Sequence, residues 1–155
     1  DQYAGSVRTL ISDPATIDKE LQEADLVIGA VLIPGAAAPK LVREETVKKM
    51  KKGAVLVDVA IDQGGCFENS KKTSHDDPTF QVHDTLFYCV ANMPGAVANT
   101  STRALSSATL PYIRAVANDS LDAAIKRFPG LEGGVMTRGG RLVSEPVRKA
   151  FDWED

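Results

Sequence analysis

The 155-residue sequence has little cysteine, no long apolar run and no strong net charge. Its two cysteines, Cys66 and Cys89, lack the spacing of a disulfide framework or a metal site, which favours a reducing, cytoplasmic location. No apolar run approaches the roughly 20 residues that span a bilayer. A formal net charge of -3 gives no electrostatic footprint for nucleic acid or an anionic membrane. With 43% hydrophobic and 25% charged residues, the composition is that of a soluble globular protein.

Four other features are missing from the sequence. No Gly-x-Gly-x-x-Gly motif follows an apolar run, and there is no internal repeat. The chain begins with Asp1 rather than methionine, and no signal-like segment follows it. We therefore expect the first residue to be a cut point or a boundary.

Short apolar runs alternate with helical patterns through the first two-thirds of the chain. The runs predict strands over residues 7–11, 25–32, 54–59 and 86–90, and helical spacing predicts helices over 14–23 and 43–51. Ser12-Asp13-Pro14 supplies a cap and a first-turn proline for the first helix, and Gly53 suits the position that closes the second. The run at 25–32, which Pro34-Gly35 ends, predicts a strand covered on both faces. This βαβαβ order predicts an α/β fold with a parallel sheet and right-handed crossovers.

After Asn99 the pattern becomes helical. A long helix, kinked at Pro111, is predicted from apolar residues on one face: Leu105, Ala108, Tyr112, Ile113 and Val116. A second helix ends before Pro129-Gly130, and a hairpin is predicted around Arg138-Gly139-Gly140. A short helix that begins after Ser144 and ends near Trp153 completes the prediction.

The most informative stretch is Val59-Ala60-Ile61-Asp62-Gln63-Gly64-Gly65-Cys66-Phe67-Glu68. It follows a buried strand and opens into a glycine pair that carries one carboxylate. In an open parallel sheet, ligands bind beyond the carboxyl ends of the strands, so Asp62 is placed for chemistry. An alternative interpretation of equal weight is that Asp62 caps the next turn while the glycines permit the bend.

Together with residues 88–97 and Thr100-Ser101-Thr102, this stretch closely resembles the alanine dehydrogenase family, a relative of the dinucleotide-binding subunit of proton-translocating transhydrogenase. The resemblance implies the C-terminal portion of an NAD-dependent L-alanine dehydrogenase, which converts L-alanine, NAD and water to pyruvate, ammonia and NADH. It implies a partial Rossmann-like doubly wound parallel sheet in residues 1–98, as the second half of a dinucleotide-binding domain. Residues 99–155 would form a connecting long helix and a tail of the substrate domain. A cytoplasmic homo-oligomer, a hexamer, is also implied.

The resemblance further implies a role for twelve residues. Asp62 would be catalytic, because its carboxylate can orient the nicotinamide ribose and a reacting water while ionised. The implied cofactor-binding residues are Ser12, Val31, Leu32, Val59, Ala60, Ile61, Asp62, Lys71, Val90, Ala91, Asn92 and Met93. No metal is implied.

Plain structural roles stay open for several of these residues. Helix capping explains Ser12 equally well, core packing explains Val31 and Leu32, and Asn92 could be a turn residue before Pro94. Lys71 stands where the family usually has arginine, which keeps the charge but loses the planar fork.

Three other reactive side chains have weaker support. His75 and His83 lie in a loop expected to be solvated, and no carboxylate partner or nucleophile spacing supports an acid–base role for them. Cys66 has no base placed beside it, so burial as a small hydrophobe is the better interpretation.

By the same resemblance, the first two nucleotide-binding strands, the phosphate loop and the substrate-binding side chains would precede residue 1. We therefore expect a gap in the sheet between residues 7–11 and 25–32, with apolar faces left exposed. We also expect the 155-residue chain alone to be inactive and to bind NAD poorly, since a missing general acid or base alone costs about 10²–10⁴-fold in rate. The preference for NAD over NADP rests on resemblance. Two alternatives stay open: a non-catalytic truncated nucleotide-binding or assembly module, and a transhydrogenase-type nucleotide subunit.

Overall fold

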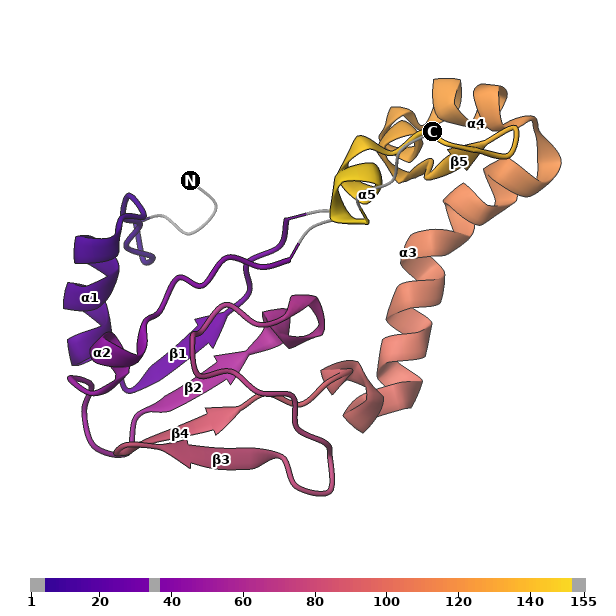
Figure 1. Cartoon of the computed structure of the whole chain (residues 1–155). Helices are drawn as coiled ribbons and strands as arrows, with labels where there is room; N and C mark the ends of the chain where they lie inside the picture. The colour runs from indigo at the N-terminus through magenta and orange to yellow at the C-terminus, as the bar shows by residue number, and fades with distance from the viewer. Residues whose placement is uncertain (1–4, 34–36, 152–155) are drawn as a thin grey trace. The chain divides into compact units, whose positions relative to one another are not determined.

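A computed structural model describes residues 5–33 and 37–151, which fall into two compact units (Figure 1). Of the described residues, 5–33 and 37–92 form the sheet unit, and 93–151 belong to the helical unit. The Pro34-Gly35 break and the predicted helix end near Trp153 lie outside the described residues.

A four-stranded mixed sheet forms the centre of the sheet unit, in the order β1-β2-β4-β3. Strands β1 (Leu26–Gly29), β2 (Val55–Asp58) and β4 (Thr85–Tyr88) run parallel. This confirms the α/β prediction and its parallel strand order, and it brings the carboxyl ends of three strands to one edge. The strands are shorter than predicted, because each apolar run continues past the last backbone pairing.

One strand was missed. β3 (Thr79–Val82) lies antiparallel to β4 in a segment predicted to be a solvated loop. The hairpin turns at His83, whose φ of 52° is in the left-handed region. Residues 79–88 alternate in burial within each strand, which is the period-2 pattern of a hairpin with one covered face.

Two helices lie in the sheet unit. α1 (Pro14–Glu23) confirms the helix predicted over 14–23, and Asp13 caps it because Oδ1 of Asp13 accepts the backbone N–H of Thr16 at 2.9 Å. α2 (Glu44–Val47) is shorter than the predicted 43–51, since the chain tightens into turns after Val47. Val47 and Met50 are still buried, as predicted, and the φ of 82° at Gly53 confirms its left-handed position.

Two strand predictions are wrong. Residues 7–11 form no strand, and Ile11 is 86% exposed. A strand requires backbone partners in a neighbouring strand, and among the described residues β1 is an edge strand that pairs with β2 alone. β1 is also covered on one face rather than two, because Leu26 and Ile28 are 58% and 62% exposed.

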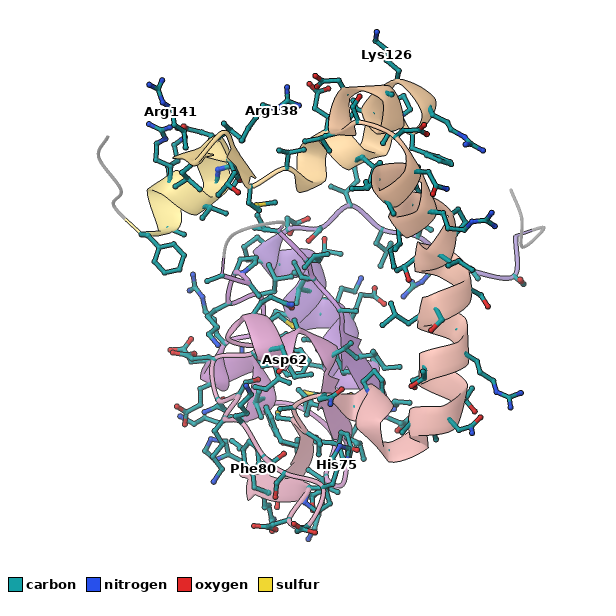
Figure 2. The ribbon with its side chains drawn as sticks, turned by 90° about the vertical axis from the view of Figure 1, so that its right-hand side faces the viewer. Asp62, His75, Phe80, Lys126, Arg138 and Arg141 are labelled. Carbon is teal, nitrogen blue, oxygen red and sulfur yellow. The ribbon has the colours of Figure 1, made fainter. Side chains whose placement is uncertain are left out.

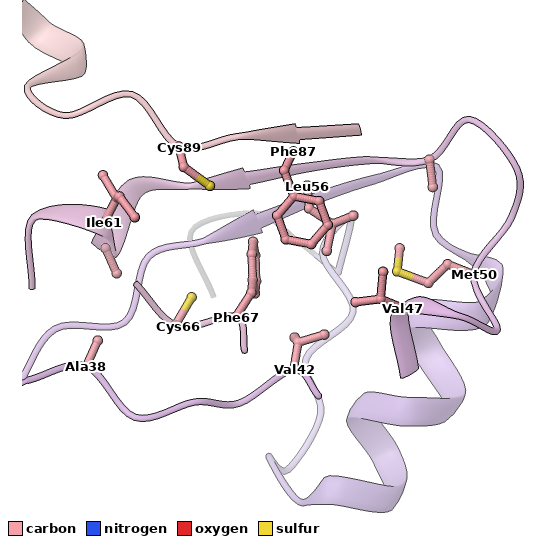
Figure 3. Packing of buried hydrophobic residues seen from close by; sticks show 12 residues of the cluster. Ala38, Val42, Val47, Met50, Leu56, Ile61, Cys66, Phe67, Phe87 and Cys89 are labelled. Atoms are coloured by element: carbon pink, nitrogen blue, oxygen red, sulfur yellow. The ribbon is translucent and has the colours of Figure 1, made fainter. Parts of the chain in front are cut away.

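The core lies on the covered face of the sheet, under α2 and the loop after β2 (Figure 3). Phe87 of β4 is fully buried, and its ring centroid is 6.0 Å from that of Phe67 and 5.3 Å from that of Phe80. Leu56, Val47 and Cys66 fill the space around these rings. Burying a large apolar side chain contributes about 1.5–3 kcal/mol, so this cluster fixes the backbone that precedes and follows Asp62.

The helical unit contains η2 (Met93–Val97), α3 (Ala98–Asn118), α4 (Leu121–Arg127), η3 (Pro129–Gly134) and α5 (Glu145–Ala150). Antiparallel β5 (Thr137–Arg138) and β6 (Arg141–Leu142) confirm the predicted hairpin. α3 continues through Pro111, and its Tyr112 ring lies 5.0 Å from the ring of Phe128. No helix among the described residues is long and apolar enough to cross a membrane.

Candidate functional site

Asp62 lies in a short 3-10 helix, η1 (Val59–Gln63), that directly follows β2. Its Oδ2 accepts the backbone N–H of Asn92 at 3.2 Å, and its Oδ1 lies 3.4 Å from Nζ of Lys72. Asn92 follows β4, so the ends of two neighbouring parallel strands meet at this carboxylate, as the sequence predicts. Figure 2 shows Asp62 and His75 on the sheet unit; Nε2 of His75 is 3.2 Å from the carbonyl oxygen of Asn92.

The backbone at this point has an uncommon conformation. Asn92 has a φ of 51°, in the left-handed region, where asparagine is better tolerated than most residues. This torsion directs the N–H of Asn92 at Asp62. Asn92 is exposed, so its side-chain amide is accessible to a ligand as both donor and acceptor.

The other predicted cofactor residues differ in how far their side chains are exposed. Leu32 and Val59 follow β1 and β2 and are 64% and 48% exposed. Ala60, Ile61 and Val90 are buried, so their side chains contact the interior and only their backbone could face a ligand. Of three further residues, Val31 and Ala91 are half-buried in the sheet unit, whereas Met93 begins η2 in the helical unit.

Ser12 lies before α1, beside a surface cavity of about 420 Å³. Asp13 occupies the cap position, which removes helix capping as the explanation for Ser12. The cavity is also lined by Lys40, Arg43 and Lys49, whereas Asp62 does not line it.

The lysine that reaches Asp62 is not the one singled out from the sequence. Nζ of Lys71 lies 4.4 Å from the centroid of the Phe80 ring, in a cation–π arrangement. The adjacent Lys72 forms the ion pair with Asp62 instead. Two neighbouring lysines in a loop carry no periodic signal, so the sequence could not separate them.

One expectation about the histidines is wrong. His83 does have a carboxylate partner, since its Nε2 is 2.9 Å from Oε1 of Glu44. This hydrogen bond, and then Lys48, hold the pKa of the Glu44 carboxyl below its usual range. The contact joins the β3–β4 turn to the first turn of α2. It lies at the end of β4 opposite to the end that meets Asp62.

A buried carboxylate lies under the glycine loop. Asp58 ends β2 and is fully buried; its Oδ2 accepts the backbone N–H of Cys66 at 2.9 Å and of Phe67 at 3.4 Å, and the hydroxyl of Ser70. Burial, followed by the nearby Asp58 charge, raises the pKa of the Cys66 thiol to about 11, and burial also raises the pKa of Cys89. Both thiols are free and buried, which confirms the interpretation of Cys66 as a small hydrophobe. An acid at the end of an apolar strand was the signal for Asp58 that sequence reasoning passed over.

No group of three or more potential metal ligands occurs in the part of the chain that the structure describes. The site therefore consists of one accessible carboxylate, a lysine, an asparagine and exposed apolar side chains at the carboxyl ends of parallel strands.

Comparison with known proteins places this arrangement in a family. Residues 1–145 match the family model described as alanine dehydrogenase/PNT, C-terminal domain. The chain belongs to the alanine dehydrogenase/PNT family. It is 54% identical over 151 residues to an alanine dehydrogenase of Mycolicibacterium smegmatis, a match that covers 97% of the chain and 41% of that relative.

Solved structures agree with this membership. An L-alanine dehydrogenase structure superposes with a TM-score of 0.76 at 44% identity, covering 97% of this chain and 42% of that one. A transhydrogenase from Sinorhizobium meliloti gives a TM-score of 0.63 at 24% identity over 86% of this chain and 36% of its own, a likeness in fold alone. The family resemblance and the Rossmann-like fold are thus confirmed. The chain spans about two-fifths of the length of the curated relatives that it matches.

Proposed function

We propose that the chain is the C-terminal portion of an NAD-dependent L-alanine dehydrogenase and supplies cofactor-binding residues to it. The observation that carries the proposal is the 54% identity to an alanine dehydrogenase over 97% of the chain. The reaction converts L-alanine, NAD and water to pyruvate, ammonium, NADH and a proton.

The residues at the carboxyl ends of the strands fit a nicotinamide nucleotide. The side chain of Asp62 is 46% exposed and offers carboxylate oxygens to ribose hydroxyls. Leu32 and Val59 offer exposed apolar surface for a ring, as nucleotide sites in open α/β sheets do. The Asn92 amide supplies the donor and acceptor that a carboxamide requires.

When bound, the cofactor accepts a hydride from the substrate carbon. In our proposal Asp62 acts as the ionised carboxylate that orients the ribose and a reacting water. The Asn92 N–H and the Lys72 ammonium fix that carboxylate at 3.2 and 3.4 Å. Leu32 and Val59 shield the ring from solvent, and Ser12 contacts the adenine side.

The relatives support further proposals about the whole protein. We propose that residues 1–98 belong to a dinucleotide-binding domain and 99–155 to a connecting helix and substrate-domain tail. We also propose a cytoplasmic homo-oligomer, a hexamer. Sedimentation of the protein that carries this sequence tests the last point, and a monomer would contradict it.

Absorbance of the reduced cofactor tests the activity directly. The purified protein carrying this sequence is mixed with L-alanine and either NAD or NADP, with D-alanine as the control substrate. We expect reduction that saturates in both L-alanine and NAD. A preference for NADP would overturn the cofactor assignment, and hydride exchange between nicotinamide nucleotides without alanine would favour a transhydrogenase-type subunit.

A further inference from the structure

The loop after Asp62 presents a row of carbonyl oxygens to a segment far from it in sequence. Nζ of Lys40 lies 2.6 Å from the carbonyl oxygen of Gly64, 2.9 Å from that of Gly65 and 3.1 Å from that of Phe67. An ammonium group has three donors and no acceptor, so these three contacts use its full capacity.

Backbone N–H groups of residues next to Lys40 bind the two carbonyls of this loop that the Lys40 side chain does not contact. The backbone N–H of Ala38 donates to Gln63 at 2.9 Å, and that of Leu41 donates to Cys66 at 2.8 Å. Residues 38–41 therefore bind every backbone carbonyl from Gln63 to Phe67. Three of the five accept from the Lys40 side chain, and of these three the Phe67 carbonyl also accepts the N–H of Ser70 at 3.2 Å.

Two backbone N–H groups of the same loop are bound by Asp58, whose Oδ2 accepts the N–H groups of Cys66 and Phe67. The glycine loop is thus held by a carboxylate that binds two of its N–H groups and by an ammonium that binds three of its carbonyls. Hydrogen bonds to charged groups are about twice as strong as neutral ones, so these contacts add to the backbone hydrogen bonds that position the loop.

Lys40 forms no ion pair in the part of the chain that the structure describes. Among residues 5–33 and 37–151, no carboxylate lies within 4.0 Å of its ammonium, although Lys49 and Lys51 both form such pairs. Lys40 is exposed, so solvent and the three carbonyl dipoles together compensate its charge. With its donors occupied, Lys40 is not free to bind an anion in the cavity that it lines.

We infer that Lys40 is a positioning residue: it fixes the Gly64–Phe67 backbone and through it the placement of Asp62. The inference rests on the proposed function of Asp62. A displacement of about 1 Å at a reacting group can cost up to 10²-fold in rate, so the lysine should affect turnover without touching substrate.

The test compares Lys40→Met with Lys51→Met in the complete protein that carries this sequence. Lys51 is a matched control, because its ammonium also binds a backbone carbonyl, that of Glu23 at 2.7 Å, which precedes β1 and so lies at the opposite ends of the parallel strands from the glycine loop. In Lys40→Met we expect kcat at saturating substrate to fall about 10–100-fold. Amide hydrogen exchange at Gly65 and Cys66 should quicken about 10-fold or more, since the loop opens locally. In Lys51→Met neither quantity should change by more than about 2-fold.

A conservative variant separates positioning from folding. Lys40→Arg keeps the charge and several donors, so we expect slow exchange in the loop and a kcat within about 10-fold of the wild type. This variant also serves if Lys40→Met does not fold. Lys40→Met that matches Lys51→Met in both kcat and exchange would overturn the inference, as would faster exchange with unchanged kcat. Exchange needs no substrate, so it tests the role of Lys40 in the loop even if the wild-type protein does not oxidise alanine.

Discussion

Asn92 donates its backbone N–H to Oδ2 of Asp62 across 3.2 Å, joining the ends of two parallel strands that lie 30 residues apart in the chain. The donor residue has a φ of 51°, a conformation that costs energy for a side chain other than glycine. Such torsions occur where the surrounding structure fixes them, and they are common at functional sites. The carboxylate thus receives a fixed backbone donor while almost half of it stays exposed.

Replacing this carboxylate should affect turnover much more than stability. Hydrogen bonds to charged groups contribute about 1.5–3 kcal/mol, so Asp62→Asn should lower kcat about 10–100-fold. Its unfolding free energy should change by less than about 1 kcal/mol, because the side chain is partly exposed and its ion pair lies at the surface. Asp84→Asn is the control, since Asp84 is exposed at the opposite ends of the same strands. Loss of folding with unchanged activity per folded molecule would support a capping role for Asp62.

The two loop glycines should respond differently to the same change. Gly64 and Gly65 have φ values of 93° and 76°, but a methyl group on Gly65 would lie 2.7 Å from Oδ2 of Asp58, whereas one on Gly64 would meet open space. Gly64→Ala should therefore cost about 1 kcal/mol for the torsion, and Gly65→Ala about 2–4 kcal/mol. Denaturant unfolding of the two variants measures the difference. Equal losses would show that backbone conformation alone selects glycine here.

Alkaline conditions should weaken the fold through Cys66. Its pKa is raised from an ordinary value of 9.0 to about 11 in the folded state, so the unfolded chain loses this proton first. The stabilisation is complete below pH 9 and is lost as pH rises toward 11, by about 2 kcal/mol. Unfolding measured at pH 8 and at pH 10.5 gives the slope. Cys66→Ala should flatten the slope relative to the wild type, and an unchanged slope would contradict the assignment.

Lys71 and Lys72 should differ in their effect on the proposed reaction. Lys72→Gln removes the ammonium next to Asp62, so kcat/KM should fall about 2–10-fold. Lys71→Gln removes a contact to Phe80 and should alter kcat/KM by less than about 2-fold, with a stability loss of about 0.5–1 kcal/mol. Each variant removes one positive charge, so steady-state kinetics of the two shows which lysine affects kcat/KM. A larger effect at Lys71 would restore the role that the family resemblance gives it.

Local patterns predicted much of the fold. The cap at Asp13, the buried side chains of Val47 and Met50, and the hairpin at Gly139 follow from spacing and turn chemistry, which act over a few residues. The predicted strand at 7–11 failed because a strand depends on a partner that composition cannot supply. β3 was not predicted because polar segments that contain both histidines flank its four residues, although these alternate polar and apolar as a strand requires.

The sequence predicted the carboxylate of the candidate site, but it did not predict the residues that position this carboxylate and the loop beside it. Asp62 and Asn92 follow apolar runs, so a parallel sheet brings them together. Lys40, Asp58 and Lys72 act through contacts that only the folded chain creates. A lysine 24 residues before a glycine has no visible relation to it until the hydrogen bond forms.

That same separation has a kinetic consequence. The glycine loop receives its shape only after the chain closes a 24-residue loop between Lys40 and Gly64, and closing such a loop carries an entropy cost that a local turn avoids. A peptide covering residues 55–68 would retain every residue of the motif and yet sample many loop shapes. In folding, the arrangement around Asp62 should therefore form with long-range docking, after local helices such as α1 have begun to form.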